Sequence, residues 1–149
     1  MNTELPAALS EIKDDFLALE QRDRLQLLLE FSNELPPLPP QYENHPDLFE
    51  RVVECQSPVF IFVEVQDDGT VHMHATAPAE APTTRGFASI LAQGISGLTA
   101  ADVLGIPDDY PLDIGLTQAV SPLRMRGMVA MLGRVKRQIR EKTAALSAQ

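Results

Sequence analysis

Cys55 is the only cysteine in the chain, and its thiol is the side chain best suited to covalent chemistry. A single thiol excludes an internal disulfide and dithiol exchange by a CxxC motif, and it suits a reducing compartment. A lone cysteine is most often a small buried apolar residue. Here Gln56, Ser57 and Pro58 follow it, and these residue types favour a turn. We therefore expect Cys55 on a loop, where its thiol can be reached.

The residues close to Cys55 work against an ionised thiol. Glu54 precedes it and is expected to raise its pKa, unless Arg51 or an arginine distant in the sequence offsets that charge. No histidine stands at a spacing typical of a Cys–His pair, although folding can bring His45 closer, so the pattern disfavours a thiol hydrolase. The pattern favours a thiol that receives a group with help from outside.

Two histidines form the other candidate site. His72 and His74 lie two residues apart in a segment with strand character, so their side chains point to one face. A metal needs further ligands, and none is evident nearby in the sequence. We predict a solvated strand face here, with no metal site and no bound cofactor.

Helices are predicted ahead of the cysteine. Pro6 suits a helix start, and apolar residues recur at helical spacing to about residue 20 and again over residues 24–34. Residues 1–35 are therefore predicted to form a helical hairpin. The sequence PPLPP then ends any helix, because proline lacks the amide hydrogen. Residues 36–42 are interpreted as a stiff extended connector rather than a ligand for a polyproline-binding domain.

A β-hairpin lies at the centre of the predicted α+β core, residues 43–149. Residues 59–66 (VFIFVEVQ) are rich in β-branched and aromatic side chains, and residues 70–77 (TVHMHATA) alternate in character. Between them, residues 67–69 (DDG) supply the turn. The pattern indicates a small antiparallel sheet.

Further helices complete the predicted core. An apolar stripe begins near Thr83 and ends at the glycines of residues 94–97, and Thr99 is placed to cap a short helix. Residues 107–111 are expected to form a turn-rich loop, and the Ser-Pro pair at 121–122 begins a long final helix whose methionines fill the core. This order predicts an α+β fold, with a small antiparallel sheet and helices packed against one of its faces.

Length and charge limit the function classes. The chain has 149 residues, enough for one domain, 1–149, and not comfortably two. Residues 1–120 hold 5 Lys/Arg against 20 Asp/Glu, whereas residues 121–149 hold 7 against 1, for a net charge of −9. An acidic body repels polyanions, so we expect no nucleic-acid partner. The basic end is interpreted mainly as an offset to a helix dipole, with a docking face for an acidic partner as the alternative.

The sequence also bears on location. No apolar run approaches the roughly 18–20 residues needed to cross a bilayer. The N-terminal residues are acidic where a secretory signal is basic. We expect a cytoplasmic protein with no membrane partner, and a monomer at this size.

Three short motifs stand in order along the chain. They are Cys55-Gln56-Ser57 before an apolar strand, Arg85-Gly86-Phe87 opening a helix after the hairpin, and Ser121-Pro122-x-Arg124-x-x-Gly127 opening the last helix. In this order and spacing they resemble the SufE family of sulfur-acceptor proteins, over roughly residues 35–146. The resemblance implies a SufE/NifU-like fold, with the helical hairpin in front also expected.

The resemblance also implies roles for single residues. Cys55 becomes the thiol that bears a persulfide, and Arg124 becomes the candidate for docking or for support of the thiolate. The partner-responsive loop and docking face are implied to include Gln56, Ser57, Glu80, Arg85 and Gly86. The family usually has Gly before the cysteine, where this chain has Glu54, so the loop is expected to differ in shape.

The implied function is sulfur transfer. A SufE-like protein accepts sulfane sulfur from a PLP-dependent cysteine desulfurase (SufS-like), stimulates that enzyme, and passes the sulfur to an Fe–S scaffold; it activates an enzyme rather than acting alone. We expect the loop to shelter Cys55 when the protein is free and to expose it on docking. The alternative is a non-catalytic adaptor or regulator that keeps the fold and docks without transferring a persulfide.

Overall fold

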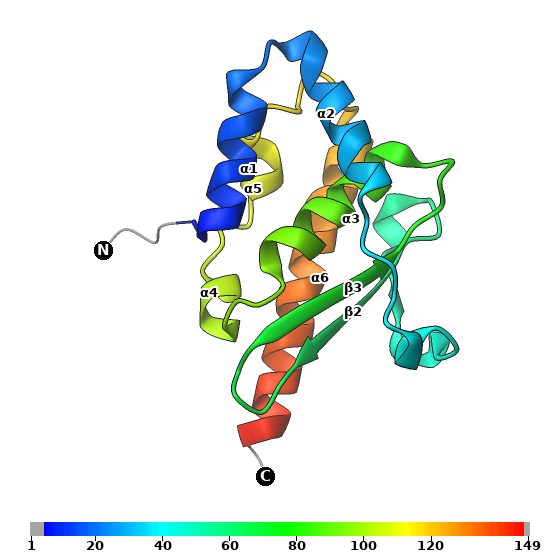
Figure 1. The fold of residues 1–149 in the computed structure, drawn as a ribbon, viewed down its shortest axis with the longest axis vertical. Coiled ribbons are helices and arrows are strands. Elements are labelled where there is room, and N and C mark those ends of the chain that lie inside the picture. Colours follow the sequence, from blue (N-terminus) through cyan, green and yellow to red (C-terminus); the bar gives the residue numbers. More distant parts are fainter. Residues whose placement is uncertain (1–4, 148–149) are drawn as a thin grey trace.

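The computed structural model describes residues 5–147 (Figure 1). Residues 1–4 and 148–149 of the predicted domain lie outside the described residues. The elements are α1 (Ala7–Ala18), α2 (Gln21–Asn33), β1 (Glu50–Arg51), β2 (Phe60–Val65), β3 (Val71–Thr76), α3 (Pro82–Ile95), α4 (Ala100–Leu104), α5 (Tyr110–Asp113) and α6 (Pro122–Ser147). Within these residues, the six helices and the three-stranded antiparallel sheet confirm the predicted α+β class.

The sheet has the order β1-β2-β3, and both neighbouring pairs are antiparallel. Gly69 turns the chain between β2 and β3 with a φ of +87°, a conformation that favours glycine. Side chains alternate between the two faces, and one face is buried through Ile61, Val63, Val71, Met73 and Ala75. The core therefore lies against a single face of the sheet, as predicted.

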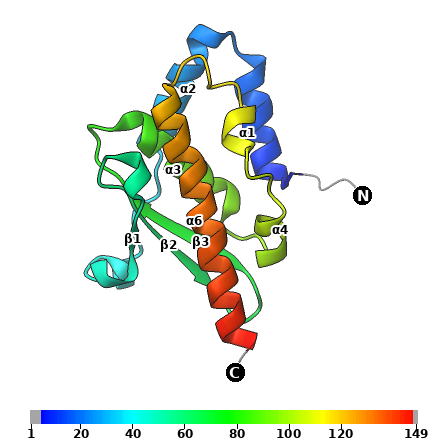
Figure 2. The same cartoon turned by 180° about the vertical axis from the view of Figure 1, so that it is seen from behind.

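Helices α3 and α6 cover this buried face. Figure 2 shows α6 running along the length of the molecule, behind the sheet as seen in Figure 1. The methionines of α6 are buried as predicted, at Met125, Met128 and Met131. Because α6 begins near the Cys55 loop and continues past β2, one helix connects the candidate site to the sheet.

The α1–α2 hairpin packs on α3 at the end of the molecule away from the β2–β3 turn (Figure 1). Two glycines of α3 allow the close approach, because a Cβ at Gly86 would overlap Leu28 and a Cβ at Gly94 would overlap Leu9. Helix α3 ends at Ile95, between the two glycines that were predicted to end it, and Gly97 takes a φ of +94° just beyond. Gly94 itself serves the packing of α3 on the hairpin.

The opposite face of the sheet is less solvated than predicted. The Tyr42 ring lies 5.1 Å from the Phe62 ring and 5.0 Å from His74, centroid to centroid. Phe49 packs on Phe62 at 5.6 Å. The His74 side chain is consequently only 15% exposed and lies 3.3 Å from Glu64. Tyr42, the last residue of the predicted connector, and Phe49 beyond it therefore cover part of this face.

Two short elements differ from the sequence prediction. Strand β1 pairs with β2 through two residues, Glu50 opposite Ile61 and Arg51 opposite Phe60, and a strand this short has no alternating pattern to detect. The predicted loop at 107–111 is a turn only to residue 109, because Pro111 suits the first turn of α5. Among residues 5–147, no helix is both long and apolar enough to cross a membrane.

Candidate functional site

Cys55 lies at the end of a single 3-10 turn, Val53–Cys55, between β1 and β2. The base of this loop is closed by a hydrogen bond from the Val52 amide to the Val59 carbonyl at 2.9 Å, and both side chains are fully buried. Glu54 lies inside the turn and does not adopt the left-handed conformation. Gln56 does, at φ +63°, which costs about 1 kcal/mol for a residue with a Cβ. The loop is thus a fixed structure on the buried anchors Val52 and Val59.

Cys55 rests on Gly127, one turn into α6. Its thiol donates to the Gly127 carbonyl at 3.6 Å. A Cβ at position 127 would lie only 3.2 Å from both the Cα and the Sγ of Cys55. The glycine of the Ser-Pro-x-Arg-x-x-Gly motif therefore makes room for the cysteine. Its role follows from the fold and was not assigned from the sequence.

The thiol is half-buried and protonated in this structure. Burial is the main cause that raises the pKa of Cys55 from its ordinary value of 9.0 to about 11. The charge of Glu54 raises the pKa further, as predicted, and the charge of Arg134 lowers it. Of the two possibilities left open by the sequence, Arg51 or a distant arginine, the structure shows a distant one, Arg134. Cys55 lies on a loop as expected, and the burial of its thiol arises from packing against α6.

A cavity of about 750 Å³ opens beside Cys55. Three segments distant in sequence line it: the cysteine loop, the start of α3 and the start of α6. Five of the seven residues implied by the resemblance lie on its wall, namely Cys55, Gln56, Ser57, Glu80 and Arg124. The sequence did not single out Thr83, Thr84 and Leu123, which complete much of the same wall.

Arg124 is exposed at the cavity, and α6 begins beside it. Ser121 caps the helix by accepting a hydrogen bond from the Arg124 amide at 3.3 Å, as the Ser-Pro pattern predicts. Among residues 5–147, no carboxylate pairs with its guanidinium. Its charge is therefore available to a ligand or partner at the cavity.

Arg85 and Gly86 lie outside the cavity wall. Arg85 donates from Nε to the Ser32 carbonyl at 2.9 Å and from Nη1 to the Ala77 carbonyl, so it joins the end of α2 to the segment after β3. Gly86 gives α2 its close approach to α3 through Leu28. Both residues hold elements that frame the cavity.

No group of three or more metal-ligating side chains gathers anywhere in residues 5–147. His74 stacks with Phe62, lies against Tyr42 with the two rings tilted, and contacts Glu64. The chemistry of the candidate site consequently rests on one thiol, the exposed guanidinium of Arg124 and the carboxylates of Glu54 and Glu80.

The comparisons with family models and with curated proteins name one family, and a solved structure shares the fold. The SufE model, described as an Fe–S metabolism associated domain, matches residues 10–139. An uncharacterized SufE-like protein of Mycobacterium tuberculosis is 53% identical over 137 residues, which are 92% of this chain and 94% of that protein. SufE-like protein 1, chloroplastic/mitochondrial, of Arabidopsis thaliana is 28% identical over 130 residues, covering 87% of this chain and 34% of that protein. The solution structure of a hypothetical protein from Thermus thermophilus has a TM-score of 0.81 at 35% identity, covering 95% of this chain and 99% of that one.

Proposed function

Since the chain belongs to the SufE family, whose domain is associated with Fe–S metabolism, we propose that it accepts persulfide sulfur on Cys55. The donor is a PLP-dependent cysteine desulfurase of the SufS-like kind, which the chain stimulates, and the sulfur continues to an Fe–S scaffold. The PLP belongs to the donor. A single thiol suits a reducing compartment, so the proposal places a monomeric carrier in the cytoplasm.

One observation carries the proposal: the only thiol of the chain lines a cavity together with Arg124. Two apolar side chains near Cys55 face solvent, with Val53 60% and Leu123 43% exposed. Apolar side chains exposed beside a reactive group suit a partner that covers them on docking. The arrangement supports delivery of sulfur by a protein rather than by a free small molecule.

The transfer needs no outside oxidant or reductant. The Cys55 thiolate attacks the terminal sulfur of the donor's cysteine persulfide, a new S–S bond forms on Cys55, and the S–S bond of the donor breaks. The donor cysteine leaves as a thiolate. The proton released from Cys55 is taken up by that thiolate, so charge and electrons balance.

The resting structure requires a change before this attack. A thiol of pKa about 11 is ionised to only about one part in 10,000 at pH 7. Docking must therefore lift Cys55 off Gly127 or bring a positive charge to it. Arg124 is available for that support at the cavity, where the new persulfide carries negative charge.

The low ionisation of the Cys55 thiol also favours one alternative function, that of an adaptor. A chain whose thiol stays covered would act as an adaptor, docking on the desulfurase and changing its turnover without receiving sulfur. The half-buried, protonated Cys55 is the observation that supports it.

Alanine release by a cysteine desulfurase separates the two functions. The rate is measured with cysteine, and with the wild-type chain or Cys55→Ser added, for more than one desulfurase. The acceptor function predicts stimulation by the wild type and none by Cys55→Ser. Equal stimulation by both chains would establish the adaptor instead.

A further inference from the structure

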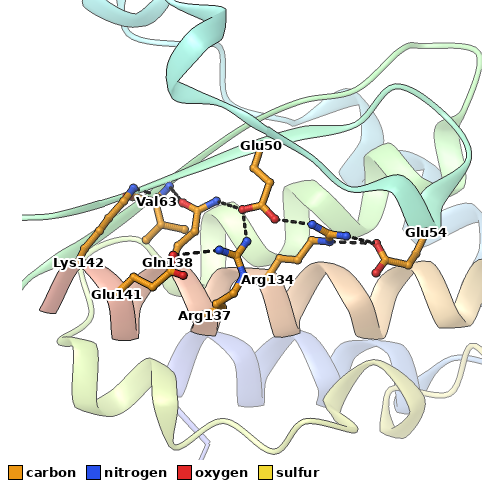
Figure 3. Close-up of polar contacts among 8 residues, drawn as sticks. All are labelled: Glu50, Glu54, Val63, Arg134, Arg137, Gln138, Glu141 and Lys142. Atoms are coloured by element: carbon orange, nitrogen blue, oxygen red, sulfur yellow. Dashed lines mark hydrogen bonds and ion pairs between the residues drawn. The ribbon is translucent and has the colours of Figure 1, made fainter. Parts of the chain in front are cut away.

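Arg134 holds two carboxylates of the segment that leads to Cys55: Glu50 on β1 and Glu54 inside the 3-10 turn (Figure 3). Its Nε and Nη2 atoms lie 3.0 and 2.9 Å from Oε1 of Glu54, and its Nη1 atom pairs with Glu50. Arg134 lies on α6 two helical turns after Gly127, on which the cysteine rests. One guanidinium therefore fastens both ends of the segment 50–54 to the helix.

The Glu50 end of this arrangement is firmly anchored. Glu50 also accepts hydrogen bonds from Arg137 and from Gln138, the latter at 2.9 Å. Burial alone would raise the pKa of Glu50, but these donors together with Arg134 hold it below its usual value. Figure 3 shows the network continuing to β2, where Gln138 accepts from the Val63 amide at 2.8 Å.

The Glu54 end is the weaker one. Within the described residues 5–147, Glu54 pairs with Arg134 alone, whereas Glu50 has three partners. The Glu54 side chain is 43% exposed against 24% for Glu50. An ion pair that is half in water contributes little and is readily exchanged for another partner. Opening the loop at Glu54 leaves Arg134 in place on Glu50.

We propose that Arg134 is the positioning residue of the cysteine loop: its pair with Glu54 holds Cys55 down on Gly127, and a docking protein opens the loop by drawing Glu54 away. A partner suited to this offers its own hydrogen-bond donors or positive charge to the Glu54 carboxylate. The closed loop is present in the chain without any partner, whereas the purpose of its opening rests on the function proposed above.

Release of Glu54 changes the charges that act on the thiol in a favourable direction. Glu54 raises the pKa of Cys55, after burial itself, and Arg134 lowers it. In the closed loop the charge of Arg134 is shared between two carboxylates. Once Glu54 is withdrawn, the anchored guanidinium keeps its place near the loop with one carboxylate fewer to neutralise it.

The test is alkylation of Cys55, the only thiol in the chain, by iodoacetamide from pH 7 to pH 10. The variant is Arg134→Gln, and the matched control is Arg140→Gln, which removes the same charge from the same helix at an exposed position. If opening the loop lowers the pKa of Cys55 by about one unit, the amount of thiolate at pH 8 rises about tenfold, while each thiolate is about threefold less reactive. Arg134→Gln should therefore react at least about threefold faster than the wild type at pH 8. Arg140→Gln should match the wild type.

The sign of the change decides the proposal. If Arg134 acted only through its charge on a loop that stays closed, its removal would raise the pKa of Cys55 and slow alkylation. An unchanged or slower Arg134→Gln overturns the proposal.

A second variant, Glu54→Gln, leaves Arg134 anchored on Glu50 and carries the test if circular dichroism shows Arg134→Gln to be unfolded. It should also react faster, and the double variant should react no faster than the faster single variant, because both changes open the same contact. If the rate increases of the two single variants multiplied in the double variant, the two residues would not act through a shared contact. Alkylation needs no desulfurase, so these results stand whether or not Cys55 accepts sulfur.

Discussion

Because the thiol is covered and its pKa is raised, we expect Cys55 to react slowly with alkylating reagents. We also expect its rate to keep rising to a higher pH than that of an uncovered thiol. Folding raises the pKa of Cys55 from 9.0 to about 11, so at pH 8 the ionised fraction falls from about one tenth to about one thousandth. A thiolate of higher pKa is also more nucleophilic, by about six- to tenfold over two units. The two effects leave the native thiol at least about tenfold slower than an uncovered one, before any steric cover by Gly127 is counted.

The assay compares the native chain with a peptide of residues 51–60, which keeps the neighbours of the cysteine and lacks the fold. Iodoacetamide rates are measured by intact mass from pH 7 to pH 10. The peptide rate should level off near pH 9, while the native rate should still rise at pH 10. Native and peptide rates within twofold of each other, or curves that bend at the same pH, would refute the reasoning. The bend distinguishes a raised pKa from simple steric cover.

Further predictions concern α6 and the thiol. Gly133→Ala should raise the free energy of unfolding in urea by about 0.5–1 kcal/mol, since a Cβ there meets nothing within 4 Å. The free energy of unfolding of Gly127→Ala should be lower than that of Gly133→Ala by at least about 1 kcal/mol, because a Cβ at position 127 would lie 3.2 Å from Cys55. Equal free energies for the two variants would contradict this packing. Arg124→Gln should leave the free energy of unfolding within about 0.5 kcal/mol and slow sulfur acceptance, while Arg126→Gln changes neither; equal rates for both variants would remove Arg124 from the site. Because the pKa of Cys55 is raised in the folded state, its proton stabilises the fold fully below pH 9, and this contribution disappears as pH rises toward 11. The stability difference between wild type and Cys55→Ala should fall across that range in urea titrations, and a constant difference would count against the raised pKa.

Local signals in the sequence predicted much of the fold. Thr99 caps α4 by accepting from the Asp102 amide at 3.2 Å, and Ser121 caps α6 in the same way. Residues 59–66, rich in β-branched and aromatic side chains, contain β2, and the alternating residues of 70–77 contain β3. These features depend on neighbours within a few positions, so the sequence alone carries them.

The sheltered state of the thiol depends on contacts that no local pattern contains. Cys55 meets Gly127 across 72 positions, and Glu54 meets Arg134 across 80. The sequence left open whether Arg51 or a distant arginine offsets Glu54, and several arginines stand in the last helix, so only the fold identifies Arg134. Long-range packing likewise explains the second role of Gly94, where a Cβ would overlap Leu9 of α1.

The central claim is that Cys55 carries the sulfur, and intact-protein mass spectrometry tests it most directly. The chain is incubated with an active cysteine desulfurase, PLP and free cysteine, beside the Cys55→Ser variant. The account predicts a gain of one sulfur atom, roughly 32 Da, that a reductant removes and that Cys55→Ser never shows. No added sulfur on the wild type, with the donor shown to be active and more than one donor tried, would contradict it.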